Sequence, residues 1–131
     1  MPDALRARFA PPERHADLRA AKAALAARGA SLCGVEIVAA SAVSVEAEPW
    51  DGDVALMLGN EGAGMSGPQL AACDRFVYVA QHGAGTASLN VAVAASIVLH
   101  RFDAWASAWA AQHCAGGADD DDGIAPPSPP P

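Results

Sequence analysis

The chain has 131 residues, of which 52% are hydrophobic, and its formal net charge is −7. This length suits one domain and this composition supplies enough apolar side chains for a core, which excludes a wholly disordered protein. Four acids form the run Asp119–Asp122 inside a proline-rich segment, so we expect residues 114–131 to be a disordered tail outside the fold. The overall acidity argues against non-specific binding of nucleic acid.

Positive charge gathers near the N-terminus. Residues 1–28 hold six Lys or Arg against three acids, whereas residues 29–114 hold two against eight. Any basic surface must therefore come from the N-terminal stretch, although a solvated helix face that binds nothing explains such an excess as well.

Cysteine usage predicts neither a metal site nor a disulfide framework. Cys33, Cys73 and Cys114 are far apart and include no C-x-x-C pair. We expect no bound metal, and reduced thiols in an intracellular compartment that the sequence does not specify further. The first residues lack the apolar core of a signal peptide, with an arginine-rich transit sequence as the alternative, and no apolar run is long enough to span a bilayer.

The predicted elements begin with an amphipathic helix over residues 17–28. Its apolar side chains share one face, and Gly29 stands where helices commonly end. A strand candidate follows over residues 31–39. Residues 40–53 are rich in acids and turn formers, and we expect a connecting loop there with at most a short extended piece.

Two further strands are predicted downstream. The run "VALML" (residues 54–58) is apolar at every position, which is typical of a strand covered on both faces of a parallel sheet, and "FVYVA" (residues 76–80) is similar. Between them, Ser66 and Gln69 form a capping box for a helix that reaches Cys73.

The last predicted helix covers residues 88–111. Its first half is apolar nearly all round, so we expect it to be buried. Taken together, the elements predict an α/β fold with a mostly parallel sheet flanked by helices. Ligands of such sheets bind at the carboxyl ends of the strands, where both glycine-rich segments, "GNEGAGMSG" and "QHGAGTAS", are placed.

The spacing of Gly62, Gly64 and Gly67 matches G-x-G-x-x-G, but the context does not fit a dinucleotide site. Asn60 and Glu61 separate the strand from the first of these glycines, a carboxylate there would repel a pyrophosphate, and no acid ends the next strand. The loop could instead present backbone groups to a small ligand, or be a strained turn in which side chains cap local N–H groups.

The segment "LMLGNEGAGMS", followed about twenty residues later by "FVYVAQHGAGTASLNVAVAASIVLH", resembles motifs two and three of the SPOUT superfamily. The similarity is to its SpoU or TrmH-type branch of tRNA and rRNA ribose 2′-O-methyltransferases, most of all to plant and algal members, over residues 31–106. It implies a trefoil knot at the C-terminal end of the domain, S-adenosyl-L-methionine as cofactor, RNA as substrate, and a homodimer.

The resemblance also implies roles for particular residues. Glu61, Ser88 and Asn90 match polar active-site positions, with helix capping as a second reading of Ser88. Independently of the resemblance, His82 is a candidate base, because an imidazole ionises near neutral pH, or a solvated spectator. The positions that match cofactor-binding backbone are Gly59, Asn60, Gly62, Val79 and Leu89.

One family feature has no counterpart here: the first motif, with its Asn and phosphate-binding Arg, belongs upstream of the strand at residues 31–39. We therefore expect an N-terminal segment over residues 1–30, a partial methyltransferase domain over residues 31–113 that lacks its N-terminal part, and the tail. Two alternatives stay open. One is a non-catalytic knotted module for dimerisation or for binding RNA or a partner, and the other is a nucleotide-binding α/β protein.

Overall fold

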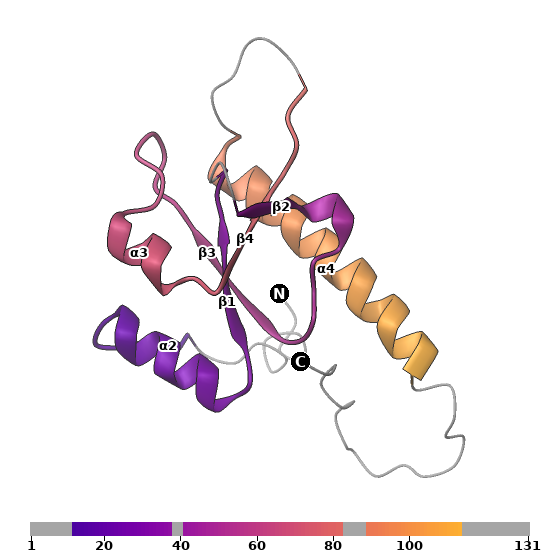
Figure 1. The fold of residues 1–131 in the computed structure, drawn as a ribbon, viewed down its shortest axis with the longest axis horizontal. Coiled ribbons are helices and arrows are strands. Elements are labelled where there is room, and N and C mark those ends of the chain that lie inside the picture. The colour runs from indigo at the N-terminus through magenta and orange to yellow at the C-terminus, as the bar shows by residue number, and fades with distance from the viewer. Residues whose placement is uncertain (1–11, 38–40, 83–88, 114–131) are drawn as a thin grey trace, which may run out of the picture.

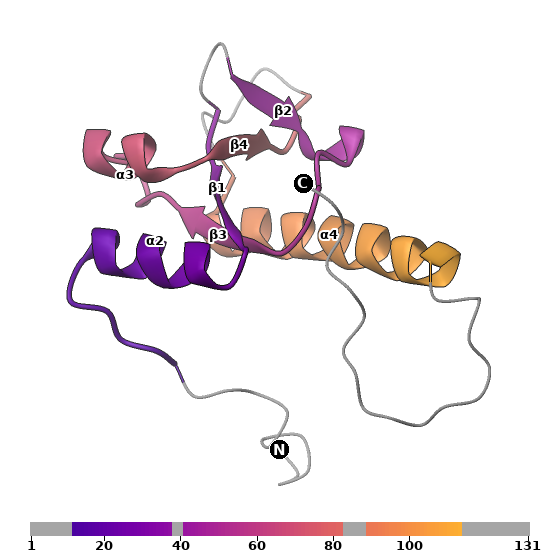
Figure 2. The same cartoon turned by 60° about the horizontal axis from the view of Figure 1, so that its bottom comes forward.

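The computed structural model describes residues 12–37, 41–82 and 89–113. Its elements are α2 (Leu18–Ala27), β1 (Ser31–Val35), β2 (Ala42–Ser44), the 3-10 helix η1 (Val45–Ala47), β3 (Val54–Leu58), α3 (Gly67–Ala72), β4 (Arg75–Tyr78) and α4 (Val91–His113). Within these residues, four parallel strands form a sheet in the order β2–β4–β1–β3, which confirms the predicted α/β fold with a parallel sheet. Helices α2 and α3 lie on one side of the sheet and α4 on the other (Figure 1 and Figure 2).

Strand β1 is central, because it pairs with β3 on one side and with β4 on the other. Val35, its last residue, lies opposite both Leu58 of β3 and Val77 of β4. Since all three strands run in the same direction, their carboxyl ends meet at one edge of the sheet.

Close packing over β1 depends on the absence of a side chain at Gly34. A Cβ atom there would lie 2.6 Å from Cδ1 of Phe76 on the neighbouring strand. The glycine therefore lets the Phe76 ring pack against the backbone of β1, on the side of the sheet opposite to Cys33.

The two helices α2 and α3 are fixed by local and long-range hydrogen bonds. Asp17 caps α2 by accepting a hydrogen bond from the Ala20 amide at 2.8 Å. The predicted capping box of Ser66 and Gln69 is present at the start of α3. Lys22 on α2 donates to Asp74, just before β4, at 2.8 Å, and so ties α2 to the end of the α3 segment.

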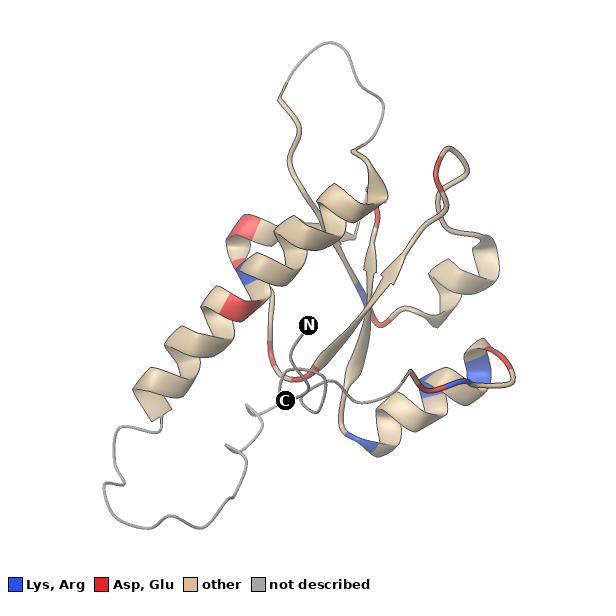
Figure 3. Ribbon diagram, turned by 180° about the vertical axis from the view of Figure 1, so that it is seen from behind, with Lys and Arg blue, Asp and Glu red and all other residues tan. Residues whose placement is uncertain are grey.

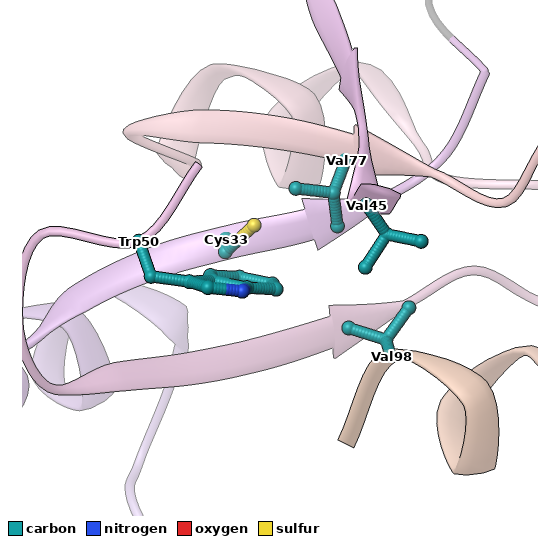
Figure 4. Close-up of a cluster of buried hydrophobic side chains, with 5 residues drawn as sticks. All are labelled: Cys33, Val45, Trp50, Val77 and Val98. Atoms are coloured by element: carbon teal, nitrogen blue, oxygen red, sulfur yellow. The ribbon is translucent and has the colours of Figure 1, made fainter. Parts of the chain in front are cut away.

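The core lies between the sheet and α4. Cys33, Val45, Trp50, Val77 and Val98 form its buried cluster (Figure 4). Trp50 meets Phe102 of α4 edge to face, with ring centroids 5.4 Å apart. These contacts place α4 across the sheet by burying one side of the helix.

Burial differs from the prediction in two places. The first half of α4 was expected to be buried, and this is wrong for the described chain: Val98 is fully buried, whereas Val93 and Leu99 are 48% and 55% exposed. One sheet face covers only one side of a helix, so the other apolar positions stay open. Similarly, β3 is an edge strand of the described sheet and its residues are half-buried rather than covered on both faces.

Element boundaries also differ. The strand predicted over residues 31–39 ends at Val35. The connecting loop contains a short extended piece, β2, as expected, and also the unpredicted helix η1. The long helix begins at Val91 and runs to His113, so its predicted cap, Ser88, lies outside the described residues. Residues 83–88 of the β4–α4 connection and the expected tail also lie outside them, and the knot and the three-part division of the chain stay predictions.

Candidate functional site

A cleft of about 790 Å³ opens at the carboxyl ends of β1, β3 and β4. Its walls come from the residues that follow each of these strands and from the N-terminal turn of α4. Its lining is Val35, Glu36, Ile37, Leu58, Gly59, Asn60, Glu61, Gly62, Ala63, Gly64, Tyr78, Val79, Gln81, Leu89, Asn90, Val91 and Ala94. The cleft therefore joins the first glycine-rich segment to residues that flank the second one, at the edge where a parallel sheet binds ligands.

The wall after β3 is a tight loop in which the backbone geometry requires glycine at several positions. Asn60 and Gly64 exchange two backbone hydrogen bonds, at 3.0 and 2.9 Å, and so close a hairpin-like turn. Gly62 and Gly64 have φ angles of +80° and +66°, which favour glycine. At Gly59 a Cβ atom would lie 2.8 Å from the carbonyl carbon of Gly64, so the two backbone segments touch directly.

This geometry argues against a dinucleotide loop. Gly67, the third glycine of the G-x-G-x-x-G spacing, begins α3 and has no atom within 4 Å of a Cβ placed there. It does not line the cleft. The glycine spacing thus arises from the turn itself and not from the close approach of a pyrophosphate.

Glu61 and Asn90 connect the two sides of the cleft. The Asn90 side-chain nitrogen, Nδ2, donates to Oε1 of Glu61 at 3.2 Å. Its oxygen, Oδ1, accepts from the Ala92 and Val93 amides at 2.9 and 3.4 Å, which caps α4. Asn90 is therefore held in one orientation by both halves of its amide group, at the exposed mouth of the cleft.

Most of the residues predicted from the sequence meet in this cleft. Seven line it: Gly59, Asn60, Glu61, Gly62, Val79, Leu89 and Asn90. Ser88 lies outside the described residues. His82 is exposed and does not line the cleft in the described structure, so its role as a base gains no support.

Sequence reasoning missed Glu36, which lies directly after β1 and lines the same cleft. Its carboxylate oxygen Oε2 accepts from the Met65 amide at 3.2 Å, in the loop that follows β3. The available signal was an acid at the end of an apolar strand. Only knowledge that β1 lies between β3 and β4 places that acid between the residues that follow those two strands.

The charges of the cleft are of one sign. Glu36 and Glu61 line it, and no Lys or Arg is present among the described lining residues. In Figure 3 most of the Lys and Arg positions lie on α2 or next to it in the chain, away from the loop of residues 59–65 after β3, which we call the glycine loop, as the sequence predicted for any basic surface. The cleft therefore suits a neutral or cationic ligand better than a polyphosphate.

Among the ionisable groups outside the cleft whose pKa values are shifted, Asp74 and Cys33 bear on the fold. The hydrogen bond from Lys22 and that from the Leu32 amide hold the pKa of Asp74 below its usual value. Burial raises the pKa of the Cys33 thiol to about 11. Both groups act in the fold: the first joins α2 to the sheet, and the second is an inert part of the core.

The class defined so far is an α/β protein with a ligand cleft at the carboxyl edge of a parallel sheet. Comparison with family models identifies it further, because residues 4–100 match the SpoU rRNA Methylase family. The chain belongs to this family. The match begins before β1, so it includes most of the N-terminal segment that the sequence analysis set apart.

Several solved structures are similar, among them the two that follow. One is the SpoU methyltransferase AviRb from Streptomyces viridochromogenes in complex with the cofactor AdoMet, with 28% identity and a TM-score of 0.56 over 66% of this chain. The other is a TrmH-family protein from Porphyromonas gingivalis, described as an RNA methyltransferase, with 23% identity and a TM-score of 0.55 over 67% of this chain.

This chain corresponds to about a third of each relative, 34% and 35% of their lengths. No curated protein matched it in sequence. Among the described helices, none has the length and hydropathy needed to cross a membrane.

Proposed function

We propose that the cleft binds S-adenosyl-L-methionine and that the protein takes part in ribose 2′-O-methylation of tRNA or rRNA. The observation that supports this most is the meeting of the two motif segments in one cleft, linked by the hydrogen bond from Asn90 to Glu61. The crystallised relative AviRb holds AdoMet, and the family is one of rRNA methylases.

The residues of the cleft fit this cofactor in size and charge. A volume of about 790 Å³ lies within the range of roughly 300–1,000 Å³ usual for cofactor pockets. Leu58, Val79 and Leu89 supply apolar walls for a purine, and backbone around Gly59 supplies hydrogen-bonding groups. When bound, the cofactor supplies a methyl group on a positively charged sulfur, which the carboxylates of Glu36 and Glu61 would favour.

Methyl transfer to a ribose needs the 2′-hydroxyl held in line with the methyl group, and needs the hydroxyl proton removed. Alignment alone can lower such a barrier by about 7 kcal/mol or more. Asn90 and Glu61 stand fixed at the mouth of the cleft and are the groups we assign to holding the ribose, together with Ser88. We assign no described residue as the base.

The exposed side of α4 supports a homodimer. Val93 and Leu99 are about half exposed, on the part of the helix turned away from Val98 and the sheet. A second copy of the chain packed on this side of α4 would explain why apolar side chains occur there and why they are exposed in one copy alone. We extend the proposal to the trefoil knot that the resemblance implies, with the segment "SLNVAVAASIVLH" (residues 88–100) as the knotted part.

The test is calorimetric titration of S-adenosyl-L-methionine into the 131-residue protein and into Asn90→Ala, Asn90→Ser and Gln112→Ala. Serine keeps a helix cap but cannot replace the donor to Glu61, whereas Gln112 is an exposed amide side chain at the other end of α4 and serves as the control. Circular dichroism confirms that each variant folds.

We expect micromolar binding by the wild type and by Gln112→Ala, and a loss of about three- to tenfold in both Asn90 variants, as one hydrogen bond is removed. A methylation assay on tRNA and rRNA transcripts with labelled cofactor follows. Binding with transfer supports the enzyme, binding without transfer favours the non-catalytic module, and no binding by a folded chain refutes the cofactor proposal.

A further inference from the structure

Glu36 occupies a fixed place in the middle of the cleft. It directly follows the central strand, and its backbone N–H donates to the Val77 carbonyl at 3.1 Å, which continues the pairing of β1 with β4. The residue is half-buried and lines the cleft between the segments that follow β3 and β4. The sheet therefore fixes the backbone of Glu36, and only its side chain can change position to contact another group.

The side chain reaches the loop after β3. Oε2 accepts the Met65 amide hydrogen at 3.2 Å, and Met65 itself is buried, with 8% of its surface exposed. The loop comes so near that a Cβ atom on Gly64 would lie 2.9 Å from Oε2. Glu36 thus holds the C-terminal end of the loop at Met65, while Asn90 holds the middle of the loop through Glu61.

The same carboxylate sets the charge of the cleft. A carboxylate accepts about four hydrogen bonds, so the contact with Met65 leaves acceptor capacity on a residue that lines the cleft. With Glu61 as the second acid and no basic residue among the described lining residues, a positive charge on a ligand is favoured over a neutral group of the same shape.

We propose that Glu36 is a positioning residue for the glycine loop and the residue that makes the cleft prefer a cationic adenosyl ligand over a neutral one. This inference rests on the proposed cofactor. The two adenosyl compounds that test it are S-adenosyl-L-methionine and S-adenosylhomocysteine, which differ by one methyl group and by the positive charge on sulfur.

The experiment measures dissociation constants of both compounds for the wild type, Glu36→Gln, Glu36→Ala and Glu48→Gln. Glutamine removes the charge and keeps an acceptor for Met65, whereas alanine removes both. Glu48 is an exposed acid outside the cleft and provides the charge-matched control.

We expect Glu36→Gln to reduce the preference for the cationic compound by about tenfold, the order of magnitude that one nearby carboxylate contributes in a half-exposed, partly screened site. Glu48→Gln should leave the preference unchanged. A merely structural role would weaken both compounds equally, so an equal loss, or no change, in Glu36→Gln overturns the proposed selectivity.

Hydrogen exchange of the Met65 amide separates this proposal from the cofactor proposal, because it needs no ligand. Exchange should be at least tenfold faster in Glu36→Ala than in Glu36→Gln and in the control. If the wild type binds neither compound, the proposed cofactor fails while the exchange result still decides the positioning role. Equal exchange in all variants overturns that role.

Discussion

Replacing Gly59 by alanine tests whether the glycines serve the loop itself. The new Cβ atom would lie 2.8 Å from the Gly64 carbonyl carbon and 3.0 Å from the Met65 amide nitrogen. Both neighbours are backbone atoms held by the bridge between Asn60 and Gly64, so the clash cannot be relieved by a side-chain rotation. We expect the free energy of unfolding to fall by about 1–3 kcal/mol, the usual cost of overpacking.

Alanine substitutions at two other glycines serve as controls, one without a clash or strain and one with backbone strain alone. Gly67→Ala meets no atom within 4 Å at the first residue of α3, and should be neutral or stabilising by about 0.4–1 kcal/mol. Gly62→Ala also meets no atom but has a φ of +80°, and should cost about 1–2 kcal/mol through backbone strain alone. Urea unfolding and cofactor titration measure all three. If Gly59→Ala matches Gly67→Ala in stability and affinity, the proposed loop geometry is wrong.

Two further predictions concern the fold and the assembly. The hydrogen bonds from Lys22 and the Leu32 amide lower the pKa of Asp74, so they stabilise the folded state above the unfolded pKa of about 4, and this stability is lost as pH falls through the lower folded-state pKa. Urea midpoints followed down to about pH 2 should show this loss in the wild type and in the exposed control Asp103→Asn, but not in Asp74→Asn. An identical pH dependence in all three proteins would contradict the role of Asp74. For the proposed dimer, Leu99→Ser should lower the dimer fraction in sedimentation analysis. It should change the free energy of unfolding of the monomer by less than about 0.5 kcal/mol. A wild type that is monomeric at every concentration would exclude this interface.

The sequence predicted the fold best where local patterns decide the structure. The "VALML" strand has the predicted bounds, and the Ser66 capping box starts a helix as expected. These features depend on short-range periodicity and capping chemistry. Burial was predicted less well, because an all-apolar stretch such as the first half of α4 does not reveal how many neighbours will cover it.

The sequence predicted those residues of the site that belong to recognisable motifs. Glu61 and Asn90 come from segments with recognisable patterns, and the structure brings them within hydrogen-bond distance. Glu36 carries no motif, and its place follows only from the strand order, which sets β1 between β3 and β4. Strand order depends on long-range pairing that residue patterns do not encode.

The shape of the cleft depends on two hydrogen bonds that each span 29 residues: Met65 to Glu36 and Asn90 to Glu61. Closing a loop of that length costs conformational entropy, which a single hydrogen bond at or near the surface does not offset. The sheet and the packing of α4 on the core around Val98 must supply the compensating free energy, since they hold both pairs of residues close together. The glycine loop should therefore order only in the folded domain, and a change that displaces α4 should disturb the cleft through Asn90 even when it lies far from any ligand.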